Sequence, residues 1–259
     1  MAGSVFDSFK LTGETAVVTG GGRGIGRAIA LGLAQAGAKI CIADLDAKTG
    51  SSVADEIRAA GGVGSAYTAD VGDEQSVEAL FKAVAADHGG PHILINNAGT
   101  AIRKPSLTVS MEDWDTVIRI NMTGSFLCAR VAARYMIEAG GGRIVNMASI
   151  MGLSGGGLYP NISYQTSKGA VVNMTRALAL EWAKSNIRVN AVAPTWVRTD
   201  FIKGLLGQPD LVKQIEAMMP LGRMADPEDI VGAVLFLASP ASGMVTGHTL
   251  PVDGGFLAQ

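Results

Sequence analysis

The chain has 259 residues, 48% of them hydrophobic, and carries a formal net charge of −2. This length fits one large α/β domain or two small ones, and because no Pro/Ser-rich linker, repeat or charge block divides the sequence, we expect a single domain over residues 1–259. The slightly acidic balance and the 5% aromatic content lack the basic footprint and stacking surfaces of a nucleic-acid-binding protein.

Seven short runs rich in valine and isoleucine alternate with longer segments of helical periodicity. The short runs are TAVVTG, KICIAD, GVGSAYTAD, HILINNAG, GRIVNMAS, IRVNAVAP and HTLPVDGG. The helical segments are Ile25–Ala36, Ala47–Ala60, Asp73–Asp87, Met111–Glu138 and Tyr164–Lys184. This alternation predicts an α/β fold in which a mostly parallel, doubly wound sheet of seven strands has helices on both faces. Ligands bind beyond the carboxyl ends of the strands in such sheets, so the loops after the strands are the candidate sites.

A glycine-rich turn, TGGGRGIG, follows the first predicted strand over Thr19–Gly26. Its key positions are Gly20, Gly24 and Gly26, with Arg23 and Ile25 between them. Glycines allow a tight turn and let a pyrophosphate approach backbone N–H groups at a helix N-terminus. The strand, turn and helix context favours this interpretation over a plain turn, although the first gap is one residue wider than in G-x-G-x-x-G.

The second predicted strand ends at Asp44, eighteen residues beyond Gly26. A carboxylate there can accept hydrogen bonds from both adenosine ribose hydroxyls and would repel a 2′-phosphate, so it favours NAD over NADP. Arg23 could assist a phosphate, but the charge of Asp44 would lie directly against it. A solvated turn residue is the alternative interpretation of Asp44.

The stretch ISYQTSKGA places Tyr164 and Lys168 four residues apart at the start of a predicted helix. Positions i and i+4 share a helix face, so the phenol and the ammonium can approach each other. A positive charge about 5 Å away favours the phenolate by roughly 3 kcal/mol at an effective dielectric of ~20, which would bring a pKa of ~10 toward the ~7 to 8 of a useful base. A packed tyrosine beside a solvated lysine is the alternative.

From Thr19 to about Gly255 the chain resembles the short-chain dehydrogenase/reductase family. The motifs that carry the resemblance are the turn at Thr19–Gly26, Ala69-Asp70, NNAG at Asn96–Gly99, Asn121 in RINMTG, Ser149 in VNMAS, Tyr164 with Lys168, VNAVAP with Thr199, and VDGG. The resemblance implies a Rossmann-like domain with a cofactor half at roughly 12–150 and a catalytic and substrate half at roughly 150–259.

The resemblance also implies a role for each matching residue. Tyr164 would be the acid/base, Ser149 would hydrogen-bond the reacting oxygen, and Lys168 would bind the nicotinamide ribose and lower the phenol pKa. Asn121 would hold a water that connects Lys168 to solvent; a structural kink in a long helix is its alternative role. The expected cofactor contacts outside the glycine turn are Asp44, Asp70, Val71, Asn96, Asn97, Ala98, Gly99, Pro194, Val197 and Thr199.

Two features depart from the family pattern. Ser149 and Tyr164 are fifteen residues apart, about two more than is usual, so Ser154 and Ser163 are conceivable substitutes for Ser149. Thr195 follows Pro194 where the family commonly has glycine.

The leading functional hypothesis is an NAD-dependent dehydrogenase acting on a secondary alcohol or ketone of a sugar, polyol or sugar acid. The long loop before Tyr164 and the segment Thr195–Arg198 supply polar groups, and Arg198 is the expected partner of a substrate anion. The C-terminal half resembles family members that act on sugars and sugar acids. The alternatives are a 3-oxoacyl-thioester reductase and a non-catalytic dinucleotide-binding protein.

Assembly and location follow from the resemblance and from the termini. Family oligomers pair the helices that carry Asn121 and Tyr164, so a homotetramer is expected. The N-terminus lacks a signal peptide and no run of about 18 apolar residues occurs, which predicts a cytoplasmic protein that is not in the membrane. Three scattered histidines, with Cys41 and Cys128 lacking metal-like spacing, predict neither a metal site nor a disulfide.

Overall fold

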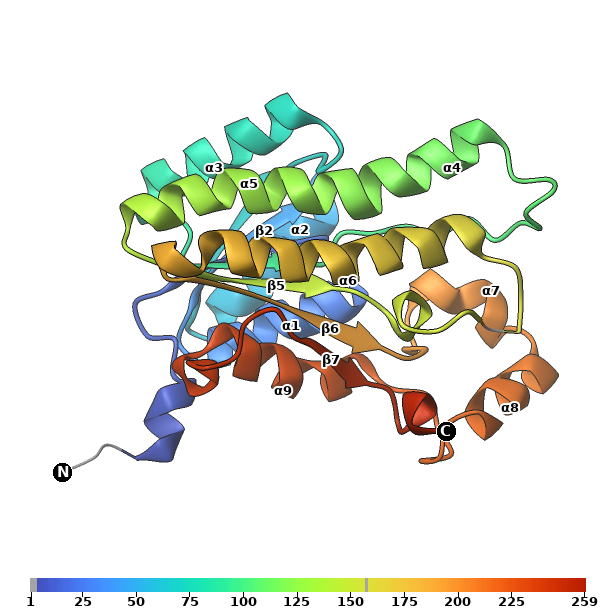
Figure 1. Cartoon of the computed structure of the whole chain (residues 1–259). Coiled ribbons are helices and arrows are strands. Elements are labelled where there is room, and N and C mark those ends of the chain that lie inside the picture. The colour runs from blue at the N-terminus through green and yellow to red at the C-terminus, as the bar shows by residue number, and fades with distance from the viewer. Residues whose placement is uncertain (1–3, 157) are drawn as a thin grey trace.

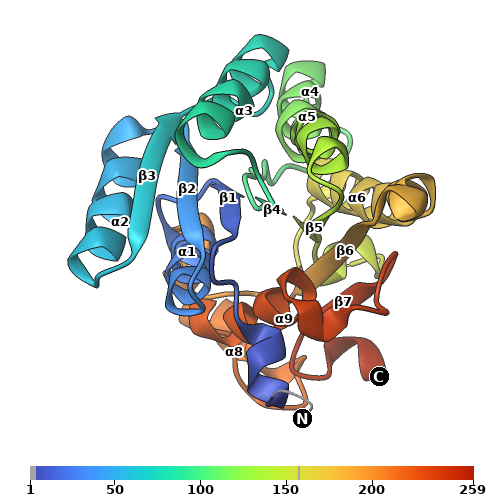
Figure 2. The ribbon, with the colours of Figure 1, turned by 90° about the vertical axis from the view of Figure 1, so that its left-hand side faces the viewer.

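The computed structural model describes residues 4–156 and 158–259. Its centre is one parallel sheet of seven strands in the order β3-β2-β1-β4-β5-β6-β7, with helices on both faces (Figures 1 and 2). The strands are β1 (Thr15–Thr19), β2 (Lys39–Asp44), β3 (Val63–Thr68), β4 (Ile93–Asn96), β5 (Gly142–Met147), β6 (Ile187–Pro194) and β7 (Thr249–Val252). The predicted doubly wound fold is confirmed.

Two helical layers cover the sheet. The layers are formed by α1 (Gly24–Gln35), α2 (Ala47–Ala59), α3 (Glu74–His88), α4 (Met111–Ile118), α5 (Gly124–Glu138), α6 (Ile162–Trp182) and α9 (Pro227–Ala238). Helices α1, α2 and α9 pack on one face around Ile29, Ile57 and Val234, and α3, α5 and α6 pack on the other around Phe81 and Met136. The short helices α7 (Lys203–Leu206) and α8 (Pro209–Ala217) lie beyond the end of β6 (Figure 1).

Local capping fixes where several helices begin. Asp46 accepts hydrogen bonds from the Lys48 and Thr49 backbone N–H groups at the start of α2. Asp73 caps α3 in the same way through Ser76 N–H. These side chains satisfy backbone donors that have no partner within the helix, so the helices start close to the predicted boundaries.

The segment predicted as one helix over Met111–Glu138 is continuous but not uniform. A π-helical turn at Arg119–Thr123 separates α4 from α5 and contains the buried Asn121. Such turns insert a residue into an α-helix and redirect the side chains around it. The π-helical turn, which is one of the recognised causes of helix kinks, therefore lies at Asn121.

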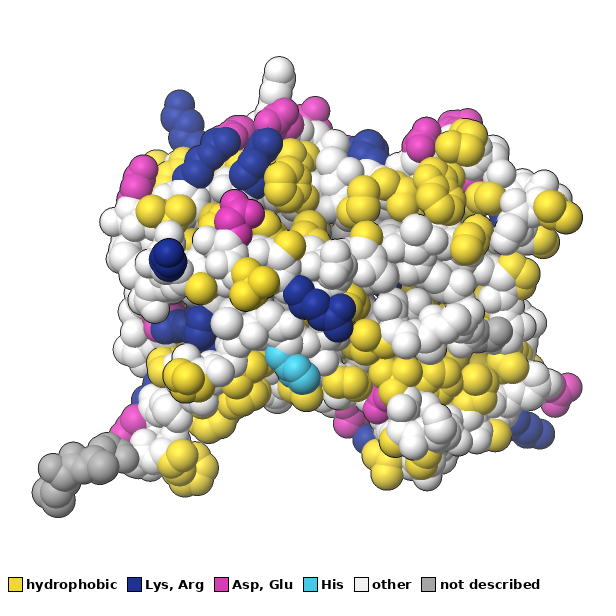
Figure 3. All heavy atoms as spheres, viewed as in Figure 1, with side chains coloured by type: hydrophobic (Ala, Val, Ile, Leu, Met, Phe, Trp, Pro, Cys, Tyr) yellow, Lys and Arg dark blue, Asp and Glu magenta, His cyan; other side chains and the backbone are white. Residues whose placement is uncertain are grey.

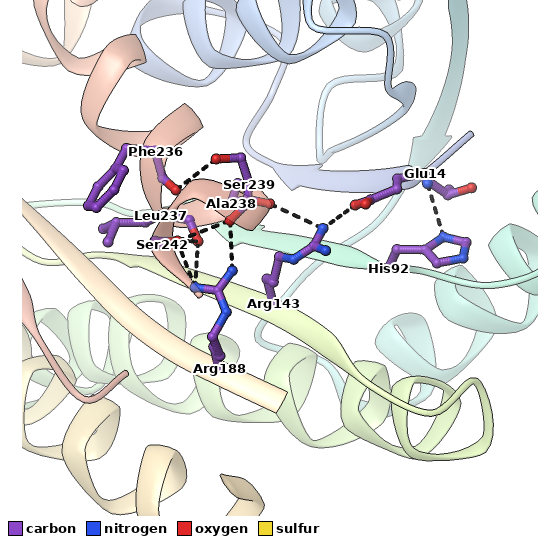
Figure 4. Close-up of polar contacts among 10 residues, drawn as sticks. Glu14, His92, Arg143, Arg188, Phe236, Leu237, Ala238, Ser239 and Ser242 are labelled. Atoms are coloured by element: carbon purple, nitrogen blue, oxygen red, sulfur yellow. Dashed lines mark hydrogen bonds and ion pairs between the residues drawn. The ribbon is translucent and has the colours of Figure 1, made fainter. Parts of the chain in front are cut away.

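At the amino ends of the strands, two arginines bind the end of α9 (Figure 4). Arg188, on β6, donates to the carbonyl oxygens of Leu237 and Ser239 and to the Ser242 hydroxyl. Arg143, on β5, donates to the Ala238 carbonyl and forms an ion pair with Glu14. Carbonyls at the end of a helix need such donors, so these side chains join the sheet to the chain that follows α9.

The opposite edge holds the carboxyl ends of β1 and β4, where the strand order reverses direction. A crevice forms at such a switch point because the loops leave toward opposite faces of the sheet. Within the residues that the structure describes, no helix combines the length and apolar character needed to cross a membrane.

Candidate active site

A cavity of about 560 Å³ lies at this switch point. Its lining contains the glycine turn, Asp44 and the NNAG loop at one end, and Ser149, Tyr164 and Lys168 at the other. Every residue predicted to contact the cofactor lines this cavity except Asn96, which is buried behind it. The fold therefore brings segments from both halves of the sequence into one site. In the described ranges, no group of three or more His, Cys, Asp or Glu residues could hold a metal ion.

The glycine turn has no room for a side chain at Gly20 or at Gly26. Gly20 has φ +60°, and a Cβ there would be 2.9 Å from the Cα of Ala98. A Cβ on Gly26 would collide with the carbonyl oxygen of Gly20. Asn97 fixes the same turn from the neighbouring loop, because its Nδ2 donates to the carbonyls of Thr19 and Gly20 at 3.0 Å. The N-terminus of α1 thus faces the cavity. The positive end of the helix dipole lies there, which suits the binding of a pyrophosphate.

Hydrogen bonds from nearby backbone N–H groups hold the Asp44 carboxylate in place. One carboxylate oxygen accepts from Gly22 N–H at 2.9 Å and the other from Asp46 N–H at 3.1 Å. A Cβ on Gly22 would be 2.8 Å from Asp44 Oδ2, so glycine is needed for this contact. The carboxylate is therefore fixed beside the glycine turn and keeps lone pairs for ribose hydroxyls.

Asp70 is held by an ion pair that the sequence did not indicate. Its Oδ2 lies 3.0 Å from Arg119 Nη1, and its Oδ1 accepts from Gly72 N–H at 2.8 Å. Helix α3 is capped by Asp73, so Asp70 does not serve as its cap. The ion pair connects the loop after β3 to the π-helical turn.

Tyr164 lies in the first turn of α6, and Lys168 is one turn later with its Nζ 5.5 Å from the Tyr164 ring centroid. Lys168 is buried, and its Nζ donates to the backbone carbonyl of Met147 at 2.6 Å. Of the three serines considered for the site, Ser149 lines the cavity, whereas Ser154 donates to the Ile150 carbonyl and Ser163 is fully buried outside it.

The electrostatics differ from the prediction that Lys168 lowers the phenol pKa. Burial raises the pKa of Tyr164 to about 12, against smaller lowering effects of the Ser149 hydrogen bond and the Arg103 charge. Burial lowers the pKa of Lys168 to about 8. Desolvation is the largest cause of both shifts, because the charged form of each group loses water in the cavity wall. In the chain alone, the phenol is therefore protonated at neutral pH.

Asn121 lies behind the cavity. Its Oδ1 accepts from Thr100 N–H at 2.8 Å, and its Nδ2 donates to the Thr100 carbonyl and to Ser167 Oγ. A Cβ built on Gly99 would be 3.3 Å from Asn121 Oδ1 and 3.8 Å from Lys168 Nζ, so these two groups are near neighbours. The amide therefore fixes the loop after β4 against α6 beside the Lys168 ammonium.

Polar and aromatic groups surround the substrate end. Trp196 Nε1 donates to the Tyr159 hydroxyl at 2.7 Å, which joins the long loop before α6 to the exit of β6. Phe201 lies near the phenol of Tyr164, with the two ring centroids 6.0 Å apart. Thr195 also lines the cavity, and its hydroxyl lies 3.1 Å from Met219 Sδ.

The predicted role of Arg198 is wrong. Its guanidinium pairs with Glu216 at 2.5 Å and does not line the cavity. Arg103, from the loop after β4, lines the cavity, as Lys168 does. That loop follows the NNAG motif at the carboxyl end of a central strand, a position that could have drawn attention to Arg103 in the sequence.

Comparison with known proteins gives consistent results. A family model described as "Enoyl-(Acyl carrier protein) reductase" matches residues 20–257. D-threitol dehydrogenase of Mycolicibacterium smegmatis is 40% identical over 98% of this chain and 96% of its own length. The 2-dehydro-3-deoxy-D-gluconate 5-dehydrogenase of Escherichia coli is 39% identical over 98% of this chain and its whole length. A gluconate 5-dehydrogenase from Burkholderia cenocepacia, solved with NADP and tartrate, superposes with TM-score 0.95 at 34% identity, covering 99% of this chain and all of that one.

Proposed function

This chain belongs to the short-chain dehydrogenase/reductase family, and we propose that it transfers a hydride between NAD(H) and a secondary alcohol or ketone of a sugar, polyol or sugar acid. The observation that carries this proposal is the meeting of Ser149, Tyr164 and Lys168 in the same cavity as the glycine turn. The names of the relatives, one for a sugar alcohol and one for a sugar acid, support the substrate class.

We propose that Tyr164 moves the proton. In the reduction direction its protonated phenol donates to the carbonyl oxygen of the substrate, and in oxidation the phenolate accepts the proton of the hydroxyl. Ser149 hydrogen-bonds the same oxygen and keeps it within reach of the phenol. The positive charges of Lys168 and Arg103 stabilise the phenolate, which oxidation requires because burial holds the pKa of Tyr164 high.

The lining fits a nicotinamide dinucleotide, which when bound would accept or supply the hydride. The α1 N-terminus and Gly20, Gly24 and Gly26 would hold the pyrophosphate. Asp70, Val71 and the loop Asn97–Gly99 would border the adenosine, and Lys168 would bind the nicotinamide ribose. Pro194, Val197 and Thr199, at the exit of β6, would orient the nicotinamide. Asn121 would hold a water that links the Lys168 ammonium to solvent.

We propose NAD as the physiological cofactor. Asp44 places a fixed carboxylate beside the glycine turn, where it can bind ribose hydroxyls and would repel a 2′-phosphate. Arg23 is exposed at the start of α1 and makes no capping hydrogen bond, so it is the residue that could offset this repulsion. Two backbone N–H groups hold the Asp44 carboxylate in place, whereas the Arg23 side chain is exposed. We therefore expect Asp44 to set the preference for NAD over NADP.

We also propose a cytoplasmic homotetramer built from one domain per chain. Exposed apolar side chains lie on the helices that flank the site, including Met111 on α4, Phe126 and Ile137 on α5 and Leu180 on α6. Figure 3 shows hydrophobic side chains across the face that these helices present. Burying them between subunits would remove apolar surface from water. A solution mass equal to one chain at micromolar concentration would contradict the tetramer.

The substrate class is tested by measuring NAD reduction with aldoses, alditols and aldonates beside steroids, simple alcohols and 3-hydroxyacyl thioesters. We expect activity with members of the first set. Activity confined to the second set would contradict the sugar proposal and leave the Tyr164 mechanism in place. An enzyme that binds NADH and acts on none of these compounds would contradict the catalytic role altogether.

A further inference from the structure

Arg103 is clamped between two aromatic rings inside the cavity. Its guanidinium carbon lies 5.6 Å from the ring centroid of Tyr159 and 5.5 Å from that of Phe201. The two rings come from different segments, the loop before α6 and the chain after β6, and Phe201 also contacts the ring of Tyr164. The clamp therefore places a positive charge close to the proposed reaction centre.

The guanidinium has donors without partners in the described chain. Its Nε is buried and has no hydrogen-bond partner, and no ion pair of Arg103 occurs among the described residues. Of the carboxylates that line the cavity, Asp44 binds backbone N–H groups and Asp70 pairs with Arg119. Asp200 also lines the cavity and forms no ion pair with Arg103. A buried donor without a partner is unfavourable, so the Arg103 guanidinium is suited to donate hydrogen bonds to a ligand.

The aromatic rings hold the guanidinium by cation–π attraction, which uses none of its N–H donors. A planar guanidinium can present two of these donors along one edge. That edge matches the two oxygens of a carboxylate, which arginine binds through parallel hydrogen bonds. The other cations nearby are engaged, since Lys104 pairs with Asp113 and Arg198 with Glu216. Lys168 also lines the cavity, but its ammonium donates to the Met147 carbonyl and is assigned to the nicotinamide ribose. A single available cation suits a singly charged carboxylate better than a doubly charged phosphate.

We propose that Arg103 binds the carboxylate of the substrate and makes the enzyme a sugar-acid dehydrogenase in preference to a polyol dehydrogenase. This inference rests on the proposed function, because it assigns the substrate of the same site. The relatives include one named for a polyol and one named for a sugar acid, and this inference favours the sugar acid as the substrate of this chain. The contact of Phe201 with both Arg103 and Tyr164 limits the separation of the carboxylate and the reacting carbon to the length of a small molecule.

The test compares matched acids and polyols. Steady-state kcat/KM would be measured for D-gluconate and D-mannonate, for D-glucitol and D-mannitol, and for 6-phospho-D-gluconate. We expect the wild-type enzyme to prefer the aldonates. Arg103→Met keeps the apolar stem but loses the guanidinium and its charge, and it should lower kcat/KM for aldonates by about 10- to 100-fold, mainly through KM. Arg103→Lys should recover only part of this loss, because lysine lacks the planar edge.

The control is Lys104→Met, which removes the adjacent cation outside the cavity. It should leave kcat/KM unchanged for both the aldonates and the polyols. Equal losses of Arg103→Met on acids and polyols would show that Arg103 acts on the Tyr164 phenol or on the structure and not on a carboxylate, and would overturn the inference. A wild-type preference for the polyols, or a loss seen only with the phosphorylated acid, would also overturn it while the dehydrogenase function stands. Wild-type activity with none of these compounds but with 3-hydroxyacyl thioesters would overturn both proposals.

Discussion

Lys168 donates a 2.6 Å hydrogen bond from its Nζ to the backbone carbonyl of Met147. This contact holds the ammonium in the wall of the cavity, below the ring of Tyr164, before any ligand binds. The ammonium is thus positioned by β5 as well as by its own helix. It also remains desolvated, which gives the enzyme a measurable pH dependence of stability.

Replacement of Lys168 by methionine should stabilise the cofactor-free enzyme near neutral pH. Burial lowers the pKa of Lys168 from 10.5 to about 8, so between these values the unfolded chain binds more protons than the folded chain. Stability therefore rises with pH across this window, and the cost of burying the ammonium is fully present below it. In thermal unfolding, the Tm of Lys168→Met should be higher than that of the wild type at about pH 7, and the difference in Tm should shrink toward about pH 10.

The control for this experiment is Lys184→Met, which removes an exposed lysine just after α6. It should give no gain that depends on pH. A constant difference between Lys168→Met and wild type over the whole range would show that the buried ammonium is not destabilising.

Tyr164→Phe should abolish turnover and leave NADH affinity nearly unchanged, because the phenol acts on the substrate. General acid/base catalysis contributes about 10² or more, so we expect at least that loss in kcat. Tyr159→Phe removes a second phenol from the same cavity and should reduce kcat much less. Retention of more than about a tenth of wild-type kcat by Tyr164→Phe would make the acid/base role untenable.

Asp44→Ala should weaken NAD selection and admit NADP, since it removes both ribose acceptors and the repulsive charge. We expect the ratio of kcat/KM for NAD to that for NADP to fall about 10-fold or more, the size expected for one charge-assisted contact. Asp44→Asn keeps an acceptor for Gly22 N–H and loses the charge, so it separates the two effects. A wild-type preference for NADPH would contradict the assignment.

Arg188→Met should destabilise the fold without changing KM for cofactor or substrate. The guanidinium donates to three backbone carbonyls and one hydroxyl at the end of α9 and in the segment that follows it, and their loss should cost about 2 to 4 kcal/mol. Arg134→Met removes an exposed ion pair with Glu78 and should change stability by about 0.5 kcal/mol or less. Urea unfolding measures both, and equal effects of the two variants would contradict the structural role of Arg188.

The sequence by itself determined the sheet, the glycine turn and the pairing of Tyr164 with Lys168. Each is a local pattern: alternation of strands and helices, glycines at a strand end, and an i to i+4 spacing on a helix. Local spacing is enough because the backbone geometry of these elements is fixed. The same reasoning found Asp44 at a strand end, whereas Ser149 was identified through the family resemblance. Parallel topology places both residues at one edge of the sheet.

Only the tertiary structure decided which cation lines the cavity and how Tyr164 and Lys168 titrate. Arg198 and Arg103 both follow strands of the central sheet, but Arg198 meets Glu216 on α8, whereas Arg103 meets the rings of Tyr159 and Phe201. Likewise, the pKa of Lys168 depends on burial against Met147 rather than on its distance from Tyr164. Partners and desolvation come from segments far apart in the chain, so no spacing in the sequence encodes them.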